Sequence, residues 1–148
     1  MKKFLLIILT FLLTLTTSAQ MSKTYQISFG CVTLEHIYAP ESYIIRVFND
    51  TDHVLNLDMG DFNTSLNTIN EMINEMNTTS IGSRRVFKFI NTNIEFMRLI
   101  EQVAPYAPAG VALPTFEAKA QQGPNYILTL QDLEKLRKAL LKSQKKKK

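Results

Sequence analysis

The sequence predicts an α+β domain, with a small, mostly antiparallel sheet and two or three helices packed on one face. Short segments alternate apolar and polar side chains with the period of two that is typical of strands. Two longer segments carry apolar residues at spacings of three and four, which is typical of amphipathic helices. Apolar residues make up 45% of the 148 residues, enough for one hydrophobic core.

Residues 1–19 have the layout of a cleavable secretory signal. Two lysines precede an apolar run from Phe4 to Leu15, and small residues follow up to Ala19. The alternative is an uncleaved membrane anchor, but a membrane-spanning helix needs about 20 apolar residues and this run is shorter. We therefore expect export and cleavage near Ala19, which places the protein in the periplasm or outside the cell.

The first half of the exported chain predicts three strands. Residues 24–33 alternate as one strand, and residues 43–48 are rich in β-branched and aromatic side chains. A turn at 49–52 leads to a returning strand at 53–59, so the last two strands form a hairpin.

The clearest helix follows. Asp61 is a favourable N-cap because its carboxylate accepts hydrogen bonds from the first free backbone amides. The apolar stripe of this helix is Phe62, Leu66, Ile69, Ile73 and Met76, and an asparagine follows each of them: Asn63, Asn67, Asn70, Asn74 and Asn77. We interpret the asparagines as a solvated flank. The alternative is a ladder of amides that faces a partner strand or a glycan.

The second half is harder to assign. Residues 85–90 predict a strand and residues 94–103 a helix, with a two-stranded hairpin or one long helix from Ser83 as alternatives. Residues 104–124 predict an irregular loop because prolines, alanines and glycines are spread through them.

Residues 125–129 predict a last short strand. Thr129 and Asp132 then resemble the capping box of a leucine-rich helix. The expected organisation is thus a signal at 1–19, one α+β domain at 20–143 with an irregular loop at 104–124, and a basic tail at 144–148.

The charge is unevenly distributed along the chain. The net charge of +4 conceals an acidic body, since residues 20–134 carry seven basic and thirteen acidic side chains. The last fourteen residues carry eight cations, which are the candidate surface-binding residues of this chain: Lys135, Arg137, Lys138, Lys142, Lys145, Lys146, Lys147 and Lys148. Such asymmetry is a starting point for predicting a partner. The alternative is a solvated tail that lies against the acidic body.

Catalytic and metal-binding patterns are scarce. The single cysteine, Cys31, excludes an internal disulfide, and its apolar neighbours predict a buried thiol. In one continuous strand Cys31 and His36 lie on opposite faces, which argues against a nucleophilic dyad. The closely spaced aspartates do not follow the spacing of a calcium loop: Asp50, Asp52, Asp58 and Asp61.

We therefore expect a small, exported, non-enzymatic module that binds a protein or a glycan, with no catalytic residue, no cofactor and no nucleic acid. The alternative is weak peripheral association with an anionic membrane or envelope surface through the basic C-terminal helix, since cations near a bilayer of opposite charge stabilise binding. An enzyme of unknown type is the third reading.

Overall fold

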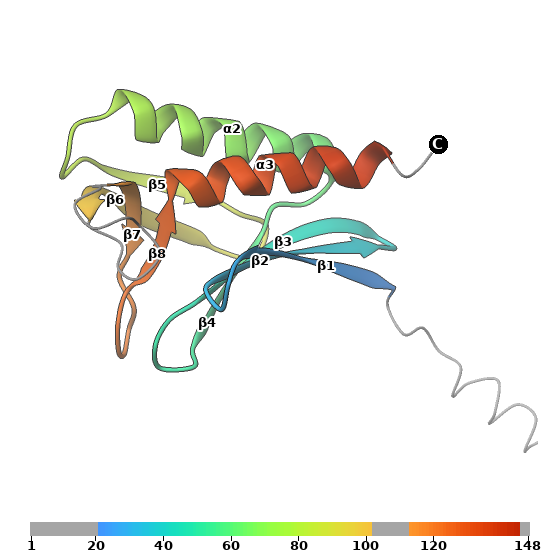
Figure 1. The fold of residues 1–148 in the computed structure, drawn as a ribbon, viewed down its shortest axis with the longest axis horizontal. Helices are drawn as coiled ribbons and strands as arrows, with labels where there is room; N and C mark the ends of the chain where they lie inside the picture. The colour runs from blue at the N-terminus through green and yellow to red at the C-terminus, as the bar shows by residue number, and fades with distance from the viewer. Residues whose placement is uncertain (1–20, 102–112, 146–148) are drawn as a thin grey trace, which may run out of the picture.

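The computed structural model describes residues 21–101 and 113–145 (Figure 1). The expected signal at 1–19, the first part of the expected loop and the last three lysines lie outside the described residues. The described part is α+β, with two four-stranded antiparallel sheets and two helices. The helices are α2 (Phe62–Thr78) and α3 (Leu130–Lys145).

The first sheet is a meander in which sequential strands are neighbours. Its strands are β1 (Ser22–Ser28), β2 (Val32–Tyr38), β3 (Glu41–Phe48) and β4 (Val54–Asp58). The expected hairpin of β3 and β4 is confirmed, with Val47 opposite Leu55. The single strand expected at 24–33 is wrong, because the chain turns through Phe29, Gly30 and Cys31 and returns as β2.

Glycine explains that turn. Gly30 has a φ of 71°, a backbone conformation that glycine adopts without steric cost, and the strands pair up to Ser28 and Val32 on either side. The apolar and polar alternation runs through the turn without a break, so periodicity alone conceals it. A second tight turn at Ala39 and Pro40, joined by a cis peptide bond, connects β2 to β3.

The second sheet is another four-stranded meander. Its strands are β5 (Arg84–Lys88), β6 (Asn93–Glu101), β7 (Leu113–Ala118) and β8 (Tyr126–Thr129). The helix expected at 94–103 is wrong over 94–101, the part that the structure describes, and the alternative hairpin is right there, with Phe96 opposite both Arg85 and Ala118. The irregular loop expected at 104–124 is also wrong over β7.

Aromatic packing explains why 94–101 is extended. The rings of Phe87, Phe96 and Phe116 come from three adjacent strands, with centroids 5.7–6.0 Å apart. Such a cluster needs one residue per strand on the same face of a sheet, which a helix over β6 would not provide. The single sheet of the sequence-based expectation is therefore two sheets.

Both helices lie on the same side of the two sheets and run antiparallel to each other (Figure 1). They pack on each other, and each contacts strands of both sheets. The predicted N-cap of α2 is confirmed, since the Thr64 amide donates to the Asp61 carboxylate at 2.9 Å. The predicted stripe is also confirmed, with Ile69, Ile73 and Met76 buried and the other two partly buried against the core.

Candidate functional site

Helix α3 is held by side-chain hydrogen bonds near both ends, and these fix which face of the helix carries its lysines toward solvent. At its start the Thr129 amide donates to the Asp132 carboxylate, while the Asp132 amide donates to the Thr129 hydroxyl, both at 3.1 Å. The predicted capping box is therefore confirmed, with Asp in the place of the usual Glu. Near its end the hydroxyl groups of Tyr43 and Ser143 lie 2.9 Å apart in the core.

Most of the apolar side of α3 packs into the core, although Leu141 is 43% exposed. Leu133, Leu136 and Leu140 have no exposed surface. Burial of three leucines stabilises the fold by roughly 5–9 kcal/mol before conformational entropy is subtracted. These side chains are therefore not free to enter a lipid bilayer unless the core opens.

The opposite side of α3 carries a row of lysines. Lys135, Lys138, Lys142 and Lys145 are all exposed, at spacings of three, four and three residues that place them on one helix face. We call them the lysine row. It extends about 15 Å along the helix, since each residue rises about 1.5 Å.

The lysine row has no acidic partner within the described residues. The close contacts between basic and acidic side chains there join Arg46 to Glu35, Arg84 to Glu95, Arg85 to Glu75 and the His36 ring to Glu41. Each contains a strand residue, and none uses a cation of α3. The structure thus brings four of the eight candidate cations together. Arg137 is half-buried outside the row, and Lys146, Lys147 and Lys148 lie outside the described residues.

A second polar row lies on α2. Its five asparagines, Asn63, Asn67, Asn70, Asn74 and Asn77, are all exposed, as expected for a solvated flank. We call them the asparagine row. No hydrogen bond to the described protein uses any of their side-chain amides. Each asparagine gives up about 0.5 kcal/mol of helix propensity relative to alanine, and no packing constraint at these exposed positions requires it.

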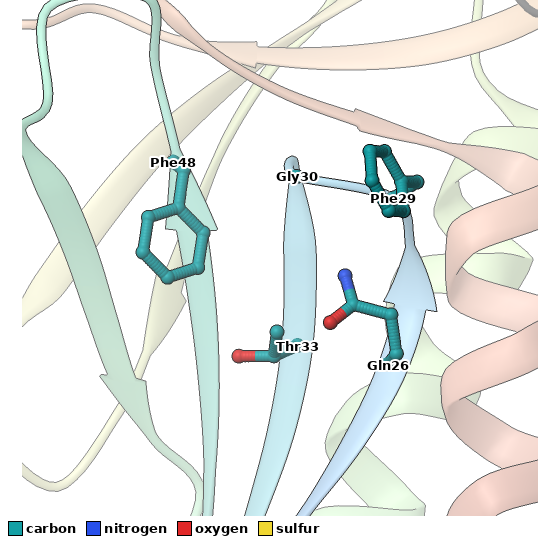
Figure 2. Close-up of a pocket in the computed structure, with 5 residues that line it drawn as sticks. All are labelled: Gln26, Phe29, Gly30, Thr33 and Phe48. Atoms are coloured by element: carbon teal, nitrogen blue, oxygen red, sulfur yellow. The ribbon is translucent and has the colours of Figure 1, made fainter.

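The sheet side of the molecule offers a different surface. The outer face of the first sheet has an open hollow of about 340 Å³, lined by Gln26, Phe29, Gly30, Thr33 and Phe48. Figure 2 shows Phe48 and Phe29 on opposite sides of it, with the Thr33 and Gln26 side chains between them. Phe29 is 80% exposed at the tip of the hairpin. Sequence reasoning missed this hollow, because it placed the turn residues inside a strand.

Cys31 and His36, the candidate nucleophilic pair, lie in different environments. Cys31 is exposed at the hairpin tip, so the expectation of a buried thiol is wrong. Partial burial, with the nearby Asp132 and Asp50 carboxylates, raises the pKa of this thiol, which opposes thiolate chemistry. His36 is buried, with its ring stacked on Tyr43 at 4.2 Å between centroids.

The clustered aspartates have structural roles. Asp58 accepts hydrogen bonds from the Ser42 hydroxyl and the Gly60 amide. Asp61 caps α2 by accepting a hydrogen bond from the Thr64 amide, and this bond lowers the pKa of the Asp61 carboxyl. Asp50 and Asp52 lie in the turn before β4. Among the residues the structure describes, no three His, Cys, Asp or Glu side chains gather in a metal-binding arrangement.

Comparison of the chain with protein-family models, curated proteins and solved structures finds no match. Neither described helix has the length and apolar character needed to cross a membrane.

Proposed function

We propose that this protein is a small, exported, non-enzymatic binding module that holds an anionic macromolecule against α3. The observation that carries the proposal is the lysine row, four exposed cations on one face with no acidic partner in the described part of the chain. Unpaired surface cations attract anions over roughly 8 Å at physiological salt. The six excess acidic charges of the body keep this attraction local to the C-terminal helix.

A peripheral protein of an anionic lipid surface is the second candidate, and the same row favours it. Here the buried leucines of α3 set the mode of binding. Because Leu133, Leu136 and Leu140 are buried in the core, the contact is mainly electrostatic. It is worth up to about 1 kcal/mol for each lysine that reaches the surface, and it weakens as salt screens the charges. An anionic macromolecule in solution requires no apolar contact, so we favour it over the bilayer.

The test is binding of dextran sulfate to the exported protein, with neutral dextran as the uncharged probe. The protein is purified from its native host, where export predicts an N-terminus near Gln20. The double variant Lys138→Gln/Lys142→Gln should bind dextran sulfate at least tenfold more weakly at low salt, because two contacts of about 1 kcal/mol each are lost. The decrease should shrink as salt is added.

The matched control is Lys88→Gln/Lys119→Gln, which removes the same charge from two exposed lysines away from α3. It should change the affinity less than threefold. If both double variants lose the same affinity, binding follows net charge alone and α3 is not the site. Vesicles of phosphatidylglycerol are run in parallel, and stronger binding to them than to dextran sulfate would favour the second candidate.

A further inference from the structure

The asparagine row and the lysine row lie on neighbouring helices. Helices α2 and α3 pack side by side and antiparallel (Figure 1). The lysine row lies opposite the buried leucines of α3, and the asparagine row lies on a flank of α2, roughly 100° around the helix from its buried stripe. Both rows are exposed, and both contribute to the outer side of the helix layer. Neighbouring helix axes lie about 8–10 Å apart, so one extended chain is able to contact both rows at once.

The two rows offer different hydrogen-bonding chemistry. A lysine ammonium only donates, so it suits a carboxylate or a sulfate. An asparagine amide both donates and accepts, so it suits a hydroxyl group, which does the same. A partner that uses both rows must carry negative charges and many hydroxyl groups along an extended chain.

Resting on the function proposed above, we propose that this outer side of the helix layer binds an acidic polysaccharide. One acidic group on some or all of the sugar units would meet the lysine row, and the ring hydroxyls would meet the asparagine row. The lysine row extends about 15 Å and the asparagine row about 21 Å, which suits a polymer better than a single small anion.

Two exposed carboxylates, Glu71 and Glu134, lie on the same helices and interrupt the cationic character of this surface. They disfavour a chain with densely packed phosphates and fit one with spaced charges. The surface also lacks exposed aromatic side chains within the described residues, since the one aromatic residue of these helices, Phe62, is partly buried against the core. Stacking of nucleic-acid bases needs such rings.

The test separates hydroxyl recognition from charge. Two probes carry the same charged group: polygalacturonate has carboxylates and ring hydroxyls, whereas poly-L-glutamate has carboxylates and no hydroxyls. The double variant Asn70→Ala/Asn74→Ala removes two amides at constant charge. Alanine is the better helix former at both exposed positions, so the fold should be kept.

The asparagine variant should bind polygalacturonate about tenfold more weakly, since two hydrogen bonds of ordinary net strength are lost. Its affinity for polyglutamate should change less than twofold, and the slope of affinity against salt should stay the same. The matched control Asn56→Ala/Asn93→Ala, which removes two exposed amides from the sheets, should bind both probes like the natural chain.

Equal losses for both polymers, or no loss for either, would overturn this inference. The function proposed above fails separately, when Lys138→Gln/Lys142→Gln binds both polymers as tightly as the natural chain. Phosphatidylglycerol vesicles form the third arm. If they bind more tightly than polygalacturonate and the asparagine variant binds them unchanged, the partner is a lipid surface and the polysaccharide inference is refuted.

Discussion

Two adjacent residues of α2 give the sharpest test of the helix layer, because the structure gives them opposite environments. Ile69 has no exposed surface, whereas Asn70 is exposed and its side-chain amide makes no hydrogen bond to the described protein. Changing each to alanine leaves the same product residue at neighbouring positions. The difference between the two variants in the free energy of unfolding then measures the effect of burial, with helix propensity as a small correction.

The magnitude follows from the atoms removed. Ile69→Ala deletes three buried carbon groups, worth about 0.8 kcal/mol each, and leaves a cavity between α2 and the sheets. The total cost should be about 3–4 kcal/mol, inside the usual range for such changes and a large part of the stability of a domain of this size. We expect the melting temperature to fall by about 10–15 °C.

Asn70→Ala should leave the free energy of unfolding unchanged or raise it by about 0.5 kcal/mol, because alanine is the better helix former. The assay is urea and thermal unfolding of both variants and the natural chain, followed by far-UV circular dichroism. Equal unfolding midpoints for the two variants would show that the buried and exposed faces of α2 are assigned wrongly. The assignment of the asparagine row to the exposed face would then be wrong as well.

Two further predictions concern the turn before β2 and the start of α3. Cys31 should react with iodoacetamide in the folded protein. Because partial burial and two nearby carboxylates raise the pKa of its thiol, the rate of this reaction should keep rising as the pH passes the usual thiol range. Complete protection of the thiol at high pH would contradict its exposed position. Thr129→Val should cost about 1–2 kcal/mol of stability by chemical unfolding, because it removes the hydroxyl that accepts from the Asp132 amide, while Thr129→Ser should restore most of it; equal losses for both changes would refute the capping box.

Local signals predicted much of this fold. The capping residue Asp61, the stripe of α2 and the leucines of α3 are predicted from residues within one or two helical turns of one another. The structure confirms the cap, the stripe and the burial of Leu133, Leu136 and Leu140, whereas Leu141 is exposed. The strand from Tyr43 to Phe48 is likewise predicted from neighbouring residues alone. In each of these elements the spacing of the apolar residues and the residues at the ends indicate the same secondary structure.

The errors arise where local patterns are ambiguous. Ile94, Met97 and Ile100 recur at a spacing of three, which suggests a helix, yet Phe96 is the residue that decides the element. Its ring needs Phe87 and Phe116 beside it, and Phe116 lies twenty positions away along the chain. Long-range pairing of this kind overrides a three-residue spacing.

Local patterns likewise predict one part of the candidate site and not the other. That Lys138 and Lys142 share a solvated face follows from the leucines that alternate with them, so the sequence predicts the lysine row. That the row lies beside the asparagines of α2 does not follow from any local pattern. It depends on the second meander, which returns the chain so that α3 runs antiparallel to α2 across both sheets.

The distribution of ion pairs is the strongest reason to place function on the helix layer rather than on the sheets. Several charged side chains of the strands are paired: Arg46 pairs with Glu35 across β2 and β3, and Arg84 pairs with Glu95 across β5 and β6. Cross-strand pairs of this kind stabilise a sheet modestly and leave little net field. The lysine row has no such partner in the described part of the chain, although the body carries an excess of acid. Four exposed cations thus lie together on one face of α3, and an external anion would neutralise them.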